Sequence, residues 1–330
     1  MSTSAPMEIN RKLIAAFVMP VTLLGAQAAF AQNYPAKAVR IITAGAGTFH
    51  DIATRHLAQR LGERWNQAVV VENQPAAGLT IGTGMAARAA PDGYTLVMAD
   101  RTSLAAAPSL YKSLSYDPAR DLAPITLVAV APLMMAIHPS IPASNLREFV
   151  DYARRQSSAM PYGSAGPATV SHIAGELFRH LTGVDLTPVH YKGGGAAVAA
   201  LLGGEVKVSF GNVPNFLPHV GAGRIKALAV MSAKRFPGAP EVPTAAEAGL
   251  PGFEAEQWVG MLAPARTPSA IVEKLNHDMV EVLRSPAMRE AMRAQGAEAA
   301  PGTPQQFTAF IASEAAKARQ IIEISGVRLN

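Results

Sequence analysis

Two short loops of small residues carry the groups best suited to hold a ligand. The first contains Gly45, Ala46 and Gly47, and the second offers the hydroxyl groups of Ser164 and Thr169. Each loop precedes a stretch whose apolar residues recur at helical spacing. Such a junction directs free backbone N–H groups and the positive end of the helix dipole at one point. Both loops therefore predict a site for a carboxylate or a phosphate, and binding there requires no enzymatic chemistry.

Three motifs typical of enzymes or nucleotide-binding proteins are incomplete in this chain. A dinucleotide fingerprint needs a third glycine where His50 stands. A serine hydrolase would use Ser164 with His172 or His190 as its base, but the nucleophile elbow G-x-S-x-G does not surround this serine. Lys192 precedes a run of glycines, whereas a P-loop has its lysine after them. The sequence therefore predicts no catalytic residue, and a tight turn without a ligand is the alternative for each loop.

The usual metal ligands are also missing from the sequence pattern. The chain has no cysteine, which excludes thiol catalysis and cysteine-bound metals, and its eight histidines form no H-E-x-x-H or H-x-H pattern. We therefore predict no metal and no cofactor. His50 has two interpretations, a hydrogen-bond donor to a bound carboxylate or a solvated residue in the first turn of a helix. Asp51 is predicted to charge the helix start and to pair with Arg55 one turn later.

Composition and the first residues set the class of protein. The chain has 330 residues, 49% of them hydrophobic and 16% charged, which predicts a globular protein of two domains. The net charge of +5 favours anionic ligands, but no run of Lys and Arg indicates nucleic-acid binding. Arg11 and Lys12 precede the apolar run 13–24, and Ala29-Phe30-Ala31 offers small residues for cleavage. Residues 1–31 are therefore predicted to be a signal peptide cleaved near Ala31-Gln32, with a membrane anchor as the alternative.

The elements that position the two loops alternate between strands and helices. Strands are predicted at residues 39–43, 69–72, 94–98, 127–137, 206–210, 225–230 and 258–262. Helices are predicted at residues 52–61, 81–88, 146–155, 172–181, 196–202, 271–284 and 305–324, and a loop at residues 162–169. This alternation predicts mostly parallel sheets flanked by helices, with ligands beyond the carboxyl ends of the strands. Because the alternation restarts after residue 137, we expect two α/β lobes with a cleft between them.

Motifs spread along nearly the whole chain resemble those of one family. They are Tyr34-Pro35; Asp51 with Arg55; Val71-Glu72-Asn73 with Gly78 and Gly82; Asp92 to Leu96; Tyr116-Asp117-Pro118 with Asp121; Tyr162 to Gly166 with His172; Tyr191 to Gly194; Leu228 to Val230; Val242-Pro243-Thr244 with Glu247 to Gly249; and Trp258 to Gly260 with Ala263-Pro264. In this order they resemble the Bug family, the extracytoplasmic solute-binding receptors of tripartite tricarboxylate transporters.

The resemblance implies a two-lobed, periplasmic-binding-protein-like (Venus flytrap) α/β fold that closes over a small organic carboxylate. Lobe 1 is expected at residues 32–130 plus 254–330 and lobe 2 at residues 131–253. The expected partners are the membrane subunits of the transporter, and the chain is expected to be a periplasmic monomer and not an enzyme. The alternatives are a periplasmic ligand-sensing protein for a signalling partner and a periplasmic hydrolase. The ligand-binding residues that the resemblance implies are Ala44, Gly45, Ala46, Gly47, Thr48, Phe49, His50, Asp51, Ser164, Ala165, Gly166, Thr169, His172 and Tyr191.

The first loop departs from the family pattern. Where the family commonly has Gly-Gly-Pro-Thr-Asp, this chain has Gly47, Thr48, Phe49, His50 and Asp51. The second loop has Pro167-Ala168 where Asn and Gly are common. Directly before Tyr191, the chain has His190 where Pro is common. Phe49 and His50 make the first loop bulkier and more aromatic. We therefore hypothesise that the ligand is an aromatic or nicotinate-like carboxylate and not a flexible citrate-like one.

Overall fold

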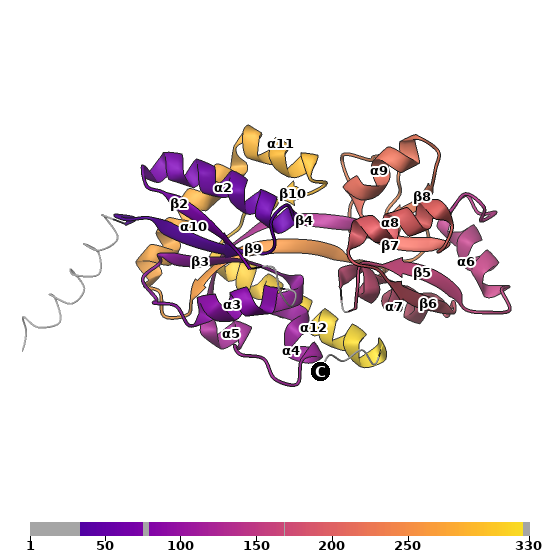
Figure 1. Cartoon of the computed structure of the whole chain (residues 1–330), viewed down its shortest axis with the longest axis horizontal. Coiled ribbons are helices and arrows are strands. Elements are labelled where there is room, and N and C mark those ends of the chain that lie inside the picture. The colour runs from indigo at the N-terminus through magenta and orange to yellow at the C-terminus, as the bar shows by residue number, and fades with distance from the viewer. Residues whose placement is uncertain (1–33, 75–78, 168, 326–330) are drawn as a thin grey trace, which may run out of the picture.

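Two lobes lie end to end along the long axis of the molecule, and two strands run from one lobe into the other (Figure 1). The computed structural model describes residues 34–74, 79–167 and 169–325. The predicted signal peptide (residues 1–31) and the motif residue Gly78 lie outside these ranges. The two shared strands are β4 (Leu122–Ile137) and β9 (Glu256–Pro264). Both directions of strand occur, because β9 is antiparallel to its two neighbours β3 and β4.

The first lobe is built on the strand order β2-β1-β3-β9-β4, with β10 beside β4. Strands β1, β2 and β3 are parallel, as predicted, and β9 and β10 complete the sheet in the antiparallel direction. Its elements besides β4 and β9 are β1 (Val39–Thr43), α2 (Phe49–Trp65), β2 (Val69–Asn73), α3 (Thr80–Ala87), β3 (Thr95–Asp100), the π-helical turn η2 (Thr102–Ala106), α4 (Ala107–Leu110), α5 (Pro118–Asp121), α10 (Ser269–Arg284), α11 (Pro286–Ala294), β10 (Glu298–Ala299) and α12 (Pro304–Ser325).

The second lobe repeats this plan with fewer strands. Strands β5, β6 and β7 are parallel, and β7 and β8 both pair in the antiparallel direction with the end of β4. Its elements are α6 (Leu146–Arg154), β5 (Met160–Ser164), α7 (Val170–Thr182), β6 (Leu186–His190), α8 (Gly194–Gly203), β7 (Val208–Asn212), α9 (Val213–Gly221) and β8 (Lys226–Val230).

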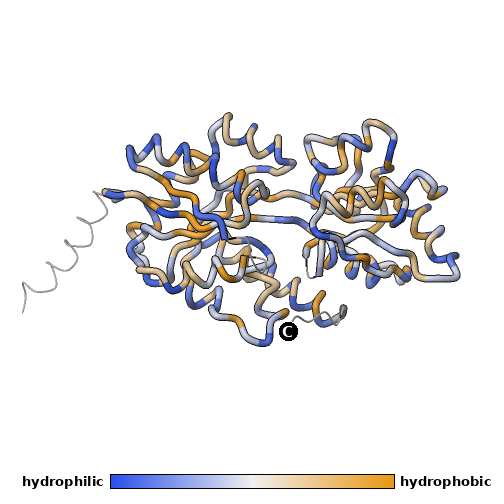
Figure 2. Tube along the Cα trace, in the orientation of Figure 1, coloured by the Kyte–Doolittle hydropathy of each residue, from blue (hydrophilic) through white to orange (hydrophobic). Residues whose placement is uncertain are grey.

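Each sheet is buried on both faces, which explains the near-continuous apolar runs of its strands. The neighbours Ile41 and Ile42 on β1 are both fully buried although they point to opposite faces. On one face Ile41 packs with residues of α2, α10 and α11, and on the other Ile42 packs with residues of α3, η2 and α12. Figure 2 shows the result, with apolar residues along the strands and hydrophilic residues on the outward turns of the helices.

The lobes meet where the two shared strands change partners. Residues 122–132 of β4 pair with β9, and residues 133–137 pair with β7 and β8. The backbone N–H of Leu133 donates to the carbonyl of Ala255 at 3.2 Å, just before β9 begins. Helix α12 forms a further connection, because it packs on the first lobe and also contacts α7 of the second lobe.

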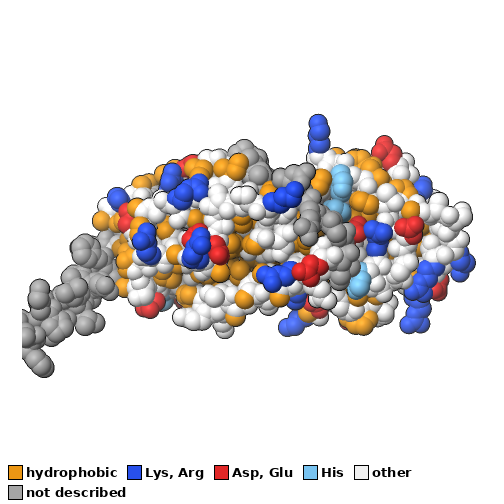
Figure 3. All heavy atoms as spheres, turned by 90° about the horizontal axis from the view of Figure 1, so that it is seen from below, with side chains coloured by type: hydrophobic (Ala, Val, Ile, Leu, Met, Phe, Trp, Pro, Cys, Tyr) orange, Lys and Arg blue, Asp and Glu red, His pale blue; other side chains and the backbone are white. Residues whose placement is uncertain are grey.

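The outer surface mixes charges of both signs. On the face seen from below, basic and acidic side chains are interspersed over both lobes (Figure 3). Among the described residues, no helix is both long enough and apolar enough to cross a membrane.

Three predictions of local structure are wrong. Residues 162–164 are the end of β5 and not part of a loop, because pairing with β6 and β7 overrides the weak strand propensity of Gly163 and Ser164. Helix α9 was not expected after β7, and the chain closes with three helices, α10, α11 and α12, where two were expected. The short elements η2, α4, α5 and β10 also carry no periodicity long enough to predict them.

Candidate functional site

The first loop is held in shape by the carboxylate of Asp51. One oxygen accepts from the backbone N–H of Gly47 at 2.9 Å, and the other accepts from Asn73 Nδ2 at 2.7 Å and from Arg55 Nε at 2.9 Å. Burial raises the pKa of Asp51, but the hydrogen bonds from Arg55, Asn73 and Gly47 outweigh it, so its pKa lies below the usual value. Thr48 caps α2 by accepting from the backbone N–H of Asp51. The predicted pairing of Asp51 with Arg55 is confirmed, and both carboxylate oxygens of Asp51 are bound by the protein, which ties the loop to α2 and to the end of β2.

His50 and Phe49 point into the first lobe. The ring nitrogen Nε2 of His50 lies 3.1 Å from Oδ2 of the buried Asp100, and His50 itself is 9% exposed. The expectation of a solvated first-turn histidine is therefore wrong, because the ring satisfies a carboxylate at the end of β3. Phe49 is half-buried and packs against the core shared by α2 and α10. Its influence on ligand choice stays a prediction.

The second loop is organised by hydroxyl groups. The Ser171 hydroxyl accepts from the backbone N–H of Ala165 at 2.8 Å and lies 2.9 Å from Thr169 Oγ1. Thr169 and Ser164 donate to the carbonyl of Gly166 at 2.7 and 3.0 Å. Thr169 stands at the N-cap of α7 without capping it through its side chain. These hydroxyl groups fix the turn, so the groups that they leave for a ligand are mainly backbone N–H groups.

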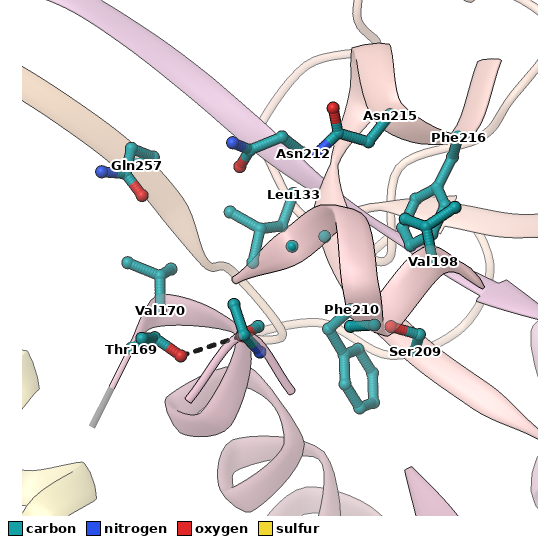
Figure 4. A pocket seen from close by; sticks show the side chains of 15 residues that line it. Leu133, Thr169, Val170, Val198, Ser209, Phe210, Asn212, Asn215, Phe216 and Gln257 are labelled. Carbon is teal, nitrogen blue, oxygen red and sulfur yellow. Dashed lines mark hydrogen bonds between the residues drawn. The ribbon is translucent and has the colours of Figure 1, made fainter. Parts of the chain in front are cut away.

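A cavity of about 200 Å³ opens where three helices of the second lobe begin (Figure 4). The first residues of α7 and α8 line it, as do the N-cap Asn212 and the third residue Asn215 of α9, so the positive ends of three helices lie around one space. The lining residues are Leu133, Ala165, Thr169, Val170, Ser171, Gly194, Ala197, Val198, Ser209, Phe210, Gly211, Asn212, Asn215, Phe216 and Gln257.

The lining of this cavity carries no ionisable side chain. Its apolar part is formed by aliphatic and phenyl groups such as Val198 and Phe216. Its polar part includes the carboxamides of Asn212, Asn215 and Gln257, and within the described ranges none of the three makes a hydrogen bond to the protein. Asn212 and Gln257 are half-buried and Asn215 is exposed, so their amide groups are accessible to a ligand that enters the cavity. A ligand with acceptor atoms and an apolar body complements this lining.

The structure brings only part of the predicted site to this cavity. Ala165 and Thr169 line it, whereas Ser164 and Gly166 lie behind it in the turn. Residues 44–51 of the first loop do not line it. Tyr191 Oη donates to Glu205 at 3.2 Å, away from the lining.

His172 also turns away from the cavity. Its ring stacks edge-on against His190, with the ring centres 4.7 Å apart, and its Nε2 lies 3.8 Å from the Glu176 carboxylate. Burial, together with His190, lowers the pKa of His172, although Glu176 acts in the opposite direction. This favours a neutral ring at neutral pH. Among the described residues, no group of three or more His, Asp or Glu side chains is placed to hold a metal ion.

The residues that the sequence analysis missed are Asn212, Asn215 and Gln257. A usable signal exists for the first two: Asn212 ends a strand and is followed at the second position by Pro214, a pattern typical of a helix start. That signal would have predicted α9 and a third helix N-terminus at the cleft. No comparable signal marks Gln257, which lies within a strand.

Two α/β lobes joined by shared strands, with helix N-termini at a cavity beside the junction, define a periplasmic-binding-protein-like receptor. The model of the "Tripartite tricarboxylate transporter family receptor" matches residues 53–327, and the chain belongs to that family. It is 35% identical over 301 residues to Protein BugT of Bordetella pertussis, covering 91% of this chain and 92% of that protein, which confirms the resemblance to the Bug family.

Solved structures agree with this assignment. R. palustris Rpa4515 with adipate has a TM-score of 0.79 and 32% identity, covering 89% of this chain and 98% of that one. MatC (Rpa3494) from Rhodopseudomonas palustris with bound malate has a TM-score of 0.74 and 30% identity, covering 88% and 100%. The predicted two-lobed fold is confirmed.

Proposed function

We propose that this chain captures a small organic carboxylate between its lobes and delivers it to the membrane subunits of a tripartite tricarboxylate transporter. The observation that carries the proposal is the convergence of three helix N-termini on an uncharged cavity at the lobe junction. Such ends attract an anion without a basic side chain, and they do so more strongly once water is excluded. The adipate and malate in the two solved relatives support a carboxylate as the ligand.

In this proposal the two predicted loops act from opposite lobes. The second loop and the starts of α8 and α9 hold one end of the ligand. The first loop, residues 44–51, offers its exposed backbone at Ala46 and meets the ligand when the lobes close. We keep the lobe boundaries near residues 131 and 254 as part of this proposal, and the change of partners of β4 at Leu133 and the start of β9 at Glu256 support them.

The remaining parts of the proposal follow from family membership. We infer a periplasmic location after removal of residues 1–31 and a non-catalytic role. A sensor that presents its ligand to a signalling partner is the second candidate function, since the same cavity would serve it. Genes for the two membrane subunits beside this one favour transport over sensing.

The test is thermal unfolding of the mature chain in the presence of acids and their amides. The panel contains adipate, malate, citrate, benzoate and nicotinate, each with its neutral amide. An acid present at 100 times its Kd adds about 2.7 kcal/mol to the free energy of unfolding, which raises the Tm measurably. A shift with an acid and none with its amide supports the proposal, whereas no shift with any acid contradicts it. The same panel on Phe49→Ala tests the aromatic-ligand hypothesis, which fails if the order of the acids is unchanged.

A further inference from the structure

Gln257 lines the cavity from a different part of the chain than the other lining residues. Those residues lie between positions 133 and 216, whereas Gln257 is the second residue of β9. It pairs with Ala131 of β4, two residues before the point where β4 leaves β9 for the second lobe. Figure 4 shows Gln257 entering from β9, while Asn212 and Asn215 enter from the opposite side. The side chain of Gln257 therefore lies at the lobe junction and lines the cavity.

The strand that carries Gln257 is anchored in the first lobe. Successive residues of a strand point to opposite faces, so the next residue, Trp258, points away from the cavity. Its indole Nε1 donates to Glu314 of α12 at 3.2 Å, and Arg101 Nε lies 3.2 Å from the same carboxylate. Trp258, Arg101 and Glu314 are all buried. The backbone of Gln257 is thus fixed to the frame of the first lobe.

The hydrogen-bonding groups of the Gln257 amide are available to a ligand. Within the described ranges it has no protein partner, and it offers two N–H donors and one carbonyl acceptor. The facing lining contains no basic side chain that would compete for a carboxylate. A ligand oxygen held at the helix ends of the second lobe is therefore a suitable acceptor for this amide.

We propose that Gln257 is the positioning residue through which a ligand held by the second lobe fixes the first lobe in the closed arrangement. The inference rests on the proposed function and assigns a role within the same site. One amide N–H donates to a ligand carboxylate oxygen, so the ligand bridges β9 of the first lobe and the helix starts of the second lobe. Asn212 and Asn215 bind the ligand from the second lobe alone, so they contribute affinity without joining the lobes. Affinity and closure are then separable by mutation.

The experiment compares Gln257→Leu with Asn215→Leu as the matched control. Adipate and malate are the probes, isothermal titration gives the Kd, and small-angle X-ray scattering gives the radius of gyration with and without saturating acid. Circular dichroism checks that each variant is folded. A lost hydrogen bond to a charged group corresponds to a roughly 10- to 100-fold weaker Kd, and we expect this for both variants. At saturation, we expect Asn215→Leu to contract as the wild type does and Gln257→Leu to contract little.

Two further variants change the charge or the length of the side chain at position 257. Gln257→Glu places a carboxylate opposite the ligand carboxylate, and we expect it to bind more weakly than Gln257→Leu. Gln257→Asn keeps the donor but withdraws it by one methylene, and we expect partial contraction. Wild-type contraction in Gln257→Leu, or binding without contraction in the wild type, overturns the proposal for Gln257. Failure of every acid to bind the wild type overturns the proposed function as well. The thermal-unfolding measurements with acids and amides detect that failure independently of any variant at position 257.

Discussion

His50 Nε2 lies 3.1 Å from Oδ2 of Asp100, and this pair ties the start of α2 to the end of β3. Asp100 also accepts from the backbone N–H and the hydroxyl of Ser103, both at 2.9 Å. Burial raises the pKa of Asp100, but the hydrogen bond and charge of His50, with Ser103, outweigh it and hold the pKa below its usual value. The histidine beside the first loop therefore serves to position that loop, since its Nε2 is engaged by the protein.

Replacing His50 should destabilise the chain. His50→Ala leaves the buried Asp100 carboxylate without its imidazole partner, and leaving a buried charged group without a hydrogen-bond partner lowers the free energy of unfolding by about 1–3 kcal/mol or more. We expect urea unfolding at pH 7 to show this loss. Asp100→Asn is the companion variant: if the pair is the cause, the double variant loses less than the sum of the two single losses. Additive losses would argue against the pair.

Asp51→Ala should loosen the first loop. The substitution removes the carboxylate that accepts hydrogen bonds from Gly47, Asn73 and Arg55. We therefore expect the free energy of unfolding at pH 7 to fall by about 1–3 kcal/mol. The pKa of Asp51 is lowered in the folded protein, so its contribution is present above the ordinary carboxyl pKa and is lost as the pH falls below it. Glu63→Ala is the control, because Glu63 pairs with Arg60 on the surface and should change stability by less than about 1 kcal/mol. Equal losses from both variants at pH 7 would contradict the role given to Asp51.

Two glycine-to-alanine changes in helices should have opposite signs. A methyl group at Gly175 of α7 would overlap the ring of Tyr162, which is fully buried and hydrogen-bonded to Glu176. We expect Gly175→Ala to lower the free energy of unfolding by about 1–3 kcal/mol. At Gly195 of α8 a methyl group meets no atom within 4 Å, and the helix propensity of alanine should add about 0.5 kcal/mol. Thermal unfolding of both variants measures these changes in stability. An unchanged stability of Gly175→Ala would show that Tyr162 can move aside.

Glu256 gives stability a pH dependence near neutrality. Burial, and then the carboxylates of Glu254 and Glu314, raise the pKa of Glu256 to about 7, with Glu298 adding to this and Lys317 opposing it. The folded chain thus holds this proton more tightly than the unfolded chain, so stability falls as the pH rises from about 4.5 to about 7. Glu256→Gln should remove this cost, adding at most about 3 kcal/mol at pH 8 and little at pH 4. Urea unfolding at both pH values measures the difference, and an equal gain at both would refute the assignment.

Much of the fold follows from the periodicity of the sequence. The strands β1, β2, β3 and β8 and the helices α2 and α10 lie within a few residues of their predicted positions, because each has a long apolar pattern of one period. Strand β5 escaped prediction since its sequence, Met-Pro-Tyr-Gly-Ser, has no β-branched residue and gains its structure from pairing with β6 and β7. The strand propensity of the residues themselves does not predict such pairing.

The site was predictable only in part, for a related reason. Glycine loops before helices identify helix N-termini, and this led to Ala165 and Thr169. Which N-termini share one cavity depends on strand order, and β7 lies between β4 and β5 although it follows both in the chain. Asn212 reaches the cavity through that order. Gln257 reaches it because β9 returns from the far end of the sequence to pair with β4.

The position of β9 also has a consequence for the order of assembly. This strand lies between β3 and β4, so the sheet of the first lobe stays divided until residues 256–264 have been made. The strands of the second lobe all lie between residues 122 and 230. During synthesis or export from the N-terminus, the lobe that begins first is therefore the lobe that is completed last. Nascent chains stopped before residue 256 would contain a complete second sheet beside an unfinished first one.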